Sequence, residues 1–264
     1  LKKHPADVHP YVAYIAKQDY GSLETVRAKV GTLLATGSLA GSVGLGMRVL
    51  QVSGGGIAKL ADKYNTGDSD KPLHGVQILY SLLWQRYVAA ALCTRAAATG
   101  PEEAIFLNIL HNMRARAGSE HYVGNGVSTV TVPSTLDLVL NQPIITLART
   151  IKPFVNSVTP GAAVHLAEEI INPGSTFVLK AIYKSGVAES HMTISNASRL
   201  PFFEADFGLG SPLAVLWGGL PTEGLSLWLP NCSGGVDVHF GLKDDIYTAL
   251  KADKLLSEFV HFAN

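Results

Sequence analysis

Residues 195–212 read SNASRLPFFEADFGLGSP, and the run Asp206-Phe207-Gly208-Leu209-Gly210 at their centre decides the fold. The two glycines of the run allow tight backbone turns that a Cβ atom would block. Asp206 lies among apolar residues, so we expect its carboxylate to be buried, where it needs a partner to stay ionised. The alternative is an exposed aspartate in a polar loop. In both cases the run has a structural role rather than a chemical one.

This run resembles the Asp-Phe-Gly-Trp-Gly signature near the C-terminus of the BAHD family of coenzyme A-dependent acyltransferases, with Leu209 in place of the tryptophan. Other segments resemble the family in the same order along the chain. They are the strand and helix of residues 47–64, the helix of residues 74–90 with Trp84 and Arg86, Asn112-Met-Arg114, Tyr122-Val-Gly-Asn125 and the ending from Gly234 onward. Each segment is a weak signal by itself, and their colinearity over residues 46–264 carries the resemblance.

The resemblance implies an α/β fold, a mixed-sheet two-layer sandwich of the chloramphenicol acetyltransferase-like type. It also divides the chain: residues 1–45 correspond to the end of an N-terminal domain and a crossover segment, and residues 46–264 to the C-terminal acyltransferase domain. The pattern of apolar residues agrees, because helices and strands alternate irregularly without a repeat. It predicts strands at 47–52, 104–113, 127–132, 177–183, 192–195, 213–217, 225–229 and 236–242, and helices at 57–64, 76–98, 135–140, 143–153, 162–171 and 244–262.

The resemblance also implies an enzyme, an O- or N-acyltransferase that moves an acyl group from an acyl-CoA thioester to a hydroxyl or amine of a small specialised metabolite. Acyl-CoA is then a co-substrate, and we expect no bound cofactor and no metal. In the family the proton acceptor is the histidine of a His-x-x-x-Asp motif. A histidine suits this task because its pKa lies near the working pH.

The chain does not contain that motif, because none of its nine histidines has an aspartate four residues further on. His165, with Glu169 in place of the aspartate, comes nearest, and a surface His–Glu pair on one helical face explains it better. We therefore predict no catalytic residue in this chain. The histidine lies on an N-terminal portion of the same enzyme, which is the expected partner. The start at Leu1 without methionine agrees with a fragment, a cleavage product or one chain of a nicked protein.

Positions just before the signature correspond to the active-site channel of the family. The family's Thr-Ser-Trp triplet appears here as Ser195-Asn196-Ala197. Two roles are open for Ser195: a hydroxyl that faces the reacting centre and stabilises a developing oxyanion, or a strand-end hydroxyl bonded to the backbone. Ala197 in place of an indole widens the acceptor pocket. Arg114 is the candidate partner of Asp206, because the family pairs that aspartate with an arginine.

The composition limits the class of partner. Lys+Arg and Asp+Glu balance at 21 each, so no basic field attracts nucleic acid or an anionic membrane. No apolar run is long enough for a transmembrane helix. Cys93 and Cys232 have no CxxC neighbour, which argues against structural zinc and for a reduced, cytoplasmic compartment. Cys93 lies in an apolar helical run, where we expect it to be buried. The run Ser53-Gly-Gly-Gly56 lacks the pattern of a phosphate loop, so a turn is the better interpretation.

Two other classes of protein stay open. The first is a catalytically inactive relative that serves as a binding or interaction module, which the missing base and the changed tryptophan positions favour. The second is a condensation-type domain of a peptide synthetase. That group shares the broad fold but lacks the Asp-Phe-Gly-x-Gly ending.

Overall fold

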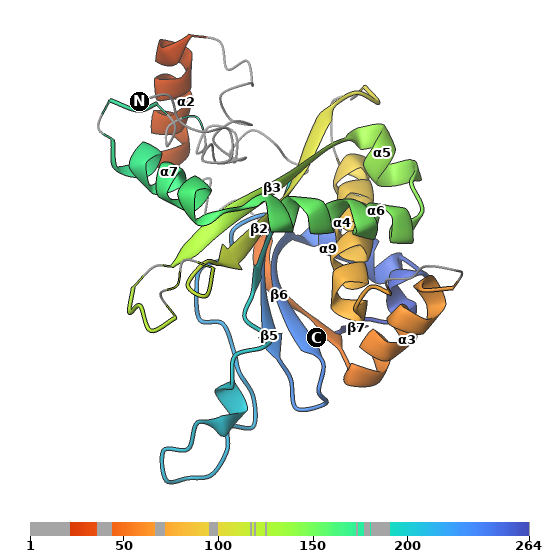
Figure 1. Cartoon of the computed structure of the whole chain (residues 1–264). Helices are drawn as coiled ribbons and strands as arrows, with labels where there is room; N and C mark the ends of the chain where they lie inside the picture. Colours follow the sequence, from red (N-terminus) through yellow and green to blue (C-terminus); the bar gives the residue numbers. More distant parts are fainter. Residues whose placement is uncertain are drawn as a thin grey trace.

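The structure is a computed structural model that describes residues 22–35, 44–66, 72–94, 100–172 apart from 117, 119 and 125, 174–176, 180 and 191–263. In this part of the chain, one mixed sheet of seven strands runs in the order β3-β2-β4-β5-β6-β1-β7 (Figure 1). Strand β4 pairs in parallel with β2 and β5, and all other pairs are antiparallel. The bounds are β1 Leu45–Val52, β2 Ala104–Asn112, β3 Val127–Thr135, β4 Met192–Asn196, β5 Leu225–Pro230, β6 Val236–Lys243 and β7 His261–Phe262.

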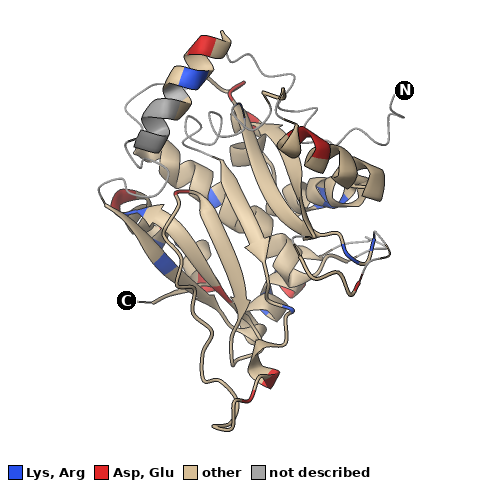
Figure 2. Ribbon diagram, turned by 90° about the vertical axis from the view of Figure 1, so that its left-hand side faces the viewer, with Lys and Arg blue, Asp and Glu red and all other residues tan. Residues whose placement is uncertain are grey.

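Helices cover one face of the sheet, which gives the second layer of the sandwich (Figure 1). They are α3 Gly54–Tyr64, α4 Gly75–Cys93, α5 Leu136–Asn141, α6 Ile144–Ser157 and α9 Asp244–Ala252. Helices α2 Leu23–Ala35 and α7 Pro160–Ile171 lie outside this layer (Figure 1). The strands carry few charged residues (Figure 2).

Helix α4 is the centre of the core. Its aromatic side chains Trp84 and Tyr87 are fully buried, and the Tyr87 ring packs against Phe240 of β6 with centroids 5.2 Å apart. Burying each such side chain contributes about 1.5–3 kcal/mol. The helix begins with a capping box: His74 accepts from the N–H of Val76, and Gln77 accepts from the N–H of His74. No described helix combines the length and apolar character needed to cross a bilayer.

Most predicted elements are confirmed. The structure has the strands expected near 47–52, 104–113, 127–132, 192–195, 225–229 and 236–242, and helices at the positions of the first five predicted helices. The helix predicted at 76–98 ends at Cys93, which is exposed at the helix end, so its expected burial is wrong. The expected strand at 177–183 lies largely outside the described residues, and the division of the chain at residue 46 stays a prediction.

Two predicted elements near the C-terminus are wrong. Residues 213–217 have irregular backbone instead of a strand. The helix predicted at 244–262 ends at Ala252. The carboxylate of Asp253 then accepts a hydrogen bond from the N–H of Leu256 at 2.8 Å, which starts a short 3-10 turn. The chain beyond it returns to the sheet as β7, which pairs with β1.

Candidate functional site

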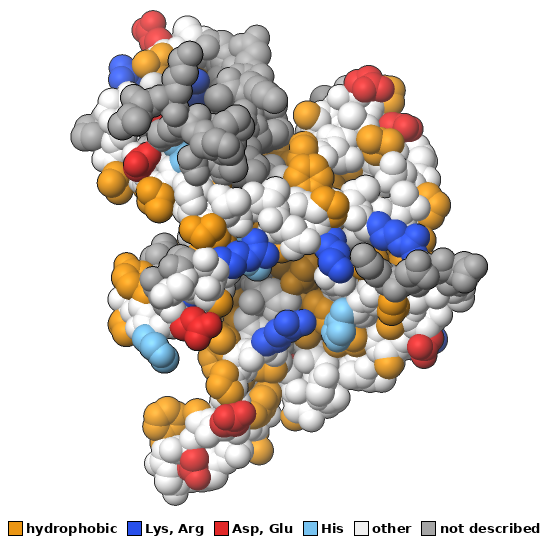
Figure 3. Space-filling view, viewed as in Figure 1, with side chains coloured by type: hydrophobic (Ala, Val, Ile, Leu, Met, Phe, Trp, Pro, Cys, Tyr) orange, Lys and Arg blue, Asp and Glu red, His pale blue; other side chains and the backbone are white. Residues whose placement is uncertain are grey.

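A cleft of about 1140 Å³ lies where the parallel strands β2 and β4 end, between those strands and helices α3, α4 and α6. Figure 3 shows basic side chains gathered around a hollow on this face. Ligands of open α/β sheets bind outside the carboxyl ends of parallel strands, so this is the candidate site. Its polar lining includes His74, Tyr80, His111, Lys152, Asn196 and Arg199.

The cleft is electropositive. Among the described residues, Lys152 and Arg199 are the fixed charges of its lining, and no aspartate or glutamate lines it. The first turn of α4 also opens into it, with the backbone N–H groups of a helix N-terminus nearby. This arrangement favours a ligand that carries negative charge.

The predicted channel triplet is divided between the two faces of the sheet. In β4 the side chains of Met192 and Ile194 are buried in the core on the helical side, so Asn196 shares their face by the two-residue period of a strand. Asn196 and Ala197 line the cleft. Ser195 lies on the opposite face and is not part of the lining. Asn196, which the sequence analysis did not single out, therefore faces the cleft where Ser195 was expected to. The two-residue alternation of side chains along a strand was the signal that could have identified it.

Asn196 connects β4 to helix α4. Its amide nitrogen donates to the hydroxyl of Tyr80, and its oxygen accepts from the N–H and the hydroxyl of Ser198 at 2.8 and 2.7 Å. The Tyr80 ring meets Trp228 edge-on, with centroids 4.8 Å apart. Burial raises the pKa of the Tyr80 hydroxyl, so the phenol stays protonated. Tyr80 is a second cleft residue that sequence reasoning missed.

His111 is the histidine of the cleft that lies at the end of β2. Burial, with a smaller contribution from the nearby Arg116 cation, lowers the pKa of His111 below its ordinary value of 6.5. The imidazole is therefore neutral at pH 7. Arg116 in turn donates to the carbonyl oxygens of Val155 and Val158 at 2.9 and 3.0 Å, which joins the loop after β2 to the end of α6.

The signature run forms its own turn, away from the cleft. The carboxylate of Asp206 is exposed and accepts the backbone N–H of Gly208 at 2.7 Å and of Gly210 at 3.0 Å. The φ angles of these glycines are 87° and 88°, a region that favours glycine. The expected burial of Asp206 is wrong, because two backbone donors and solvent satisfy its charge.

The expected ion pair between Arg114 and Asp206 is also absent from the described residues. Arg114 donates to the carbonyl oxygens of Tyr122 and Gly124 and to the side chain of Asn112. It therefore holds the loop after β2, where the resemblance places Tyr122 to Asn125, and residue 125 lies outside the described part. The roles of Arg114 and of the signature residues in the family's sense stay predictions.

An apolar strap, residues 200–220, projects from the sheet (Figure 1). Phe207 is 90% exposed and Leu209 is 96% exposed within it. The other large apolar side chains that it exposes are Leu200, Leu213, Leu216, Trp217 and Leu220. Exposed apolar surface of this kind marks an interaction site for a protein, a membrane or a ligand.

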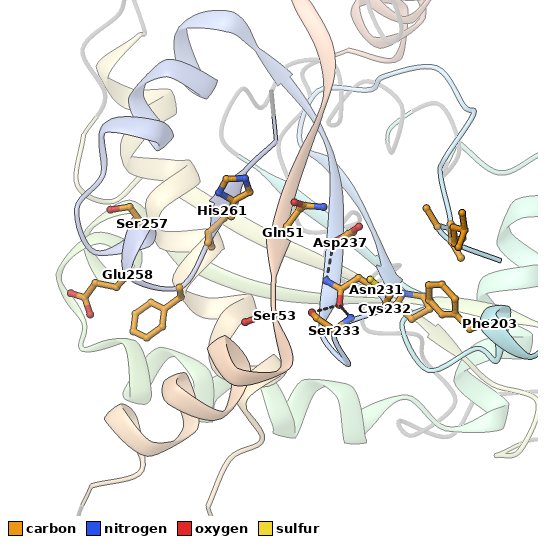
Figure 4. A pocket seen from close by; sticks show the side chains of 16 residues that line it. Gln51, Ser53, Phe203, Asn231, Cys232, Ser233, Asp237, Ser257, Glu258 and His261 are labelled. Carbon is orange, nitrogen blue, oxygen red and sulfur yellow. Dashed lines mark hydrogen bonds between the residues drawn. The ribbon is translucent and has the colours of Figure 1, made fainter. Parts of the chain in front are cut away.

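A second cavity of about 630 Å³ lies between this strap and the C-terminal residues (Figure 4). Its polar centre is the turn after β5, in which Asn231 donates to Asp237 at 2.9 Å and accepts from the N–H and hydroxyl of Ser233. These bonds hold the β5–β6 turn, so the polar groups already have partners. Cys232 is an exposed thiol at the rim.

Two sequence motifs, the His165–Glu169 pair and the glycine run after Ser53, have structural positions that can be compared with their predictions. His165 is only 8% exposed and lies 3.6 Å from Glu169, so the pair exists, but the imidazole is not on the surface as expected. It does not line the cleft. Ser53 caps α3 by accepting the N–H of Gly56 at 3.0 Å, so the glycine run forms the first turn of that helix instead of a separate turn before it. The described residues contain no group of three or more His, Cys, Asp or Glu placed to hold a metal ion.

Solved structures share this architecture at low sequence identity. TRI101 of F. sporotrichioides, complexed with coenzyme A and T-2, matches with a TM-score of 0.72 at 20% identity over 85% of this chain and 52% of that chain. TRI101 of F. graminearum, complexed with coenzyme A and deoxynivalenol, matches with a TM-score of 0.72 at 18% identity over 85% of this chain and 51% of that chain. Vinorine synthase matches with a TM-score of 0.61 at 14% identity over 83% of this chain and 48% of that chain. This chain thus spans about half the length of these structures.

These likenesses confirm the predicted mixed-sheet sandwich of the chloramphenicol acetyltransferase-like type. No curated protein matches the sequence. The sequence model of the Transferase family matches residues 45–254, which is most of the chain and nearly the range of the resemblance found in the sequence. On this match, the chain belongs to the Transferase family, that is, to the BAHD acyltransferases.

Proposed function

We propose that this chain is the C-terminal portion of an acyltransferase that moves an acyl group from acyl-CoA to a hydroxyl or amine of a small specialised metabolite. The observation that carries the proposal is the electropositive cleft at the ends of β2 and β4, lined by Asn196 and Ala197 of the family's channel triplet. TRI101 structures contain coenzyme A together with a small molecule, which agrees with a donor and an acceptor in this fold.

The partner in this proposal is an N-terminal portion that carries His-x-x-x-Asp. In the transfer step, the acceptor's oxygen or nitrogen attacks the thioester carbonyl carbon, the histidine takes the acceptor's proton, and the C–S bond breaks to release the coenzyme A thiolate. The cationic cleft supports binding of the negatively charged donor. The apolar strap supports the partner, because its side chains need a covering surface that this half of the fold does not supply.

Acyl transfer in the full-length protein tests the proposal. Acetyl-CoA and longer acyl-CoA thioesters are incubated with panels of small alcohols and amines, and release of the free thiol is followed with a thiol reagent. We expect thiol release that depends on the acceptor and is lost when the motif histidine of the N-terminal portion is changed to alanine. A correctly folded full-length protein that releases no thiol with any donor contradicts the proposal. The proposal includes a cytoplasmic location, which fractionation of the source cells tests.

A second candidate function is an inactive relative that binds a ligand or a protein. The replacement of two family tryptophans by Ala197 and Leu209 favours it. This candidate predicts binding of acyl-CoA or of a protein partner without turnover. An intact His-x-x-x-Asp in the encoding gene, together with thiol release, excludes it.

A further inference from the structure

The hydroxyl of Tyr80 has a hydrogen-bond donor that the described residues do not use. Tyr80 lies in the second turn of α4 and lines the candidate cleft. Its oxygen accepts a hydrogen bond from the amide nitrogen of Asn196. Within the described part of the chain, no acceptor meets the hydroxyl proton. A phenol has one proton to donate, so that proton is available to a molecule in the cleft.

The direction of the Asn196–Tyr80 bond is fixed by Ser198. The amide oxygen of Asn196 accepts the backbone N–H of Ser198 at 2.8 Å and its hydroxyl at 2.7 Å. Turning the amide over would place its NH₂ group against that backbone N–H, and two donors cannot bond. Asn196 therefore donates to Tyr80 and does not accept from it.

The tyrosine is held in one position and in one protonation state. Its ring meets Trp228 at an interplanar angle of 89°, and Trp228 is fully buried in the sheet. Burial raises the pKa of the Tyr80 hydroxyl, against a smaller opposing effect of the bond from Asn196. The group is thus a neutral donor on a rigid helix, the kind of group that fixes the orientation of a bound ligand.

The surroundings show which ligand atom suits this donor. The register Leu110↔Ser195 between β2 and β4 places His111 beside Asn196 on the helical face of the sheet. His111 is neutral at pH 7, and the Arg199 cation acts on Tyr80 from within the same cleft. The fixed charges of the same cleft are Lys152 and Arg199. A ligand with an anionic part and a neutral carbonyl group matches both features.

We propose that Tyr80 is a specificity-determining residue whose hydroxyl donates a hydrogen bond to a carbonyl oxygen of the molecule bound in the cleft. Asn196 is the positioning residue that fixes the tyrosine oxygen. The inference rests on the proposed function, and it adds to it the residue that recognises a carbonyl. That carbonyl belongs either to the acyl donor or to the acyl acceptor, and the experiment separates these sources.

The test uses the full-length protein with Tyr80→Phe, which keeps the ring and removes only the donor. Calorimetry measures the Kd of acetyl-CoA and of ethyl-CoA, a thioether without the acyl carbonyl, and kinetics give the KM of the best acceptor. Tyr247→Phe is the matched control, because the Tyr247 hydroxyl donates to the carbonyl of Ala263 outside the cleft. Melting temperatures of all variants are measured beside these values.

Loss of one hydrogen bond is expected to weaken the affected ligand about 3- to 10-fold. If only acetyl-CoA binds more weakly, Tyr80 donates to the acyl carbonyl. If acetyl-CoA and ethyl-CoA are weakened equally, Tyr80 donates to another carbonyl of the donor. If only the KM of the acceptor rises, Tyr80 donates to a carbonyl of the acceptor. Unchanged values for all three in a Tyr80→Phe protein that melts like wild type overturn the inference and leave the proposed function standing. A wild-type protein that neither binds nor uses acyl-CoA overturns both.

Asn196→Ala has a readout that a purely structural role does not produce. Combined with Tyr80→Phe, it is expected to weaken the ligand no further than Tyr80→Phe alone, because its effect passes through the tyrosine. Additive losses in this double variant contradict the positioning role.

Discussion

The carboxylate of Asp206 accepts a hydrogen bond from the backbone N–H of Gly210 at 3.0 Å, so the signature run closes on itself. We expect Asp206→Ala to cost this chain about 1 kcal/mol or less, because the bond is exposed and local. On the proposed function, the same change in the full-length protein should lower acyl transfer about 10-fold, because the strap loses the turn that orders its apolar side chains. Thiol-release kinetics and chemical denaturation check the two parts.

Asp206→Asn is the control for this prediction. The amide oxygen of asparagine still accepts backbone N–H groups, so the turn and the activity should persist. Equal loss of activity in both variants contradicts the turn-forming role and indicates that the charge itself matters.

Gly75 is required where α4 begins against α3. A Cβ atom at this position would lie 2.1 Å from the carbonyl oxygen of Ile57, which is backbone and cannot move aside cheaply. We expect Gly75→Ala to lower the free energy of unfolding by about 1–3 kcal/mol. The control is Gly55→Ala in α3, where the nearest atom would be 3.9 Å away. That change should stabilise the helix by up to about 1 kcal/mol. Urea denaturation followed by circular dichroism measures both, and equal effects contradict the prediction.

The stability of the protein should fall on acidification, because two histidines have lowered pKa values. Burial is the main cause for both His111 and His239, with Arg116 adding to it for His111 and Asp237 opposing it for His239. Above pH 6.5 these histidines are neutral in both the folded and the unfolded chain and contribute no pH dependence. Below pH 6.5 the unfolded chain binds more protons, so stability is lost until the pH has passed below the folded pKa values.

Urea midpoints at pH 7.5 and pH 5 measure this effect. A His111→Gln/His239→Gln variant should lose less stability between the two pH values than wild type does. The comparison uses the difference between pH values within each protein, so a general loss of stability in the variant cancels. An equal or larger loss in the variant contradicts the assignment.

The cations of the cleft should control the affinity for the donor. We expect Lys152→Glu and Arg199→Glu each to weaken acetyl-CoA binding by about 10-fold at low salt, and less at high salt because ions screen the charges. Arg149→Glu is the matched control, since Arg149 is exposed on the same helix α6 but does not line the cleft. Calorimetry at two salt concentrations measures the effect. An equal loss with Arg149→Glu would mean that net charge, and not the cleft, determines binding.

The sequence predicted most of the fold because its main elements have clear periods. The long apolar run of α4 predicted a core helix, and the structure buries that helix on nearly all sides. The apolar residues of β1 and β6 likewise marked strands that the structure contains. The C-terminal residues were harder. After Ala252 the apolar residues Leu255, Leu256 and Phe259 fit a helical period, but Asp253 and the free edge of β1 provide a better arrangement. The pairing of β7 with β1, a strand far away in the sequence, leaves no pattern in the residues around β7.

The candidate site was predicted only in part, for a similar reason. The triplet was found from its resemblance, yet which of its residues faces the cleft depends on the side of β4 that the helices cover. Tyr80 and His111 come from other elements, and only the register of β2 beside β4 joins them. The apolar neighbours of Asp206 suggested burial, whereas the structure exposes them together as the strap.

The first turns of helix α4 have two faces with different roles. In its first two turns Val76, Gln77 and Tyr80 line the cleft, while Ile78 and Leu79 of the same turns and Trp84 beyond them are buried in the core. On the proposed function, replacements at the cleft-facing positions would change which molecules fit, whereas the buried neighbours Ile78 and Leu79 are fixed by core packing. Cleft shape and core packing are thus set by different faces of the same helical turns.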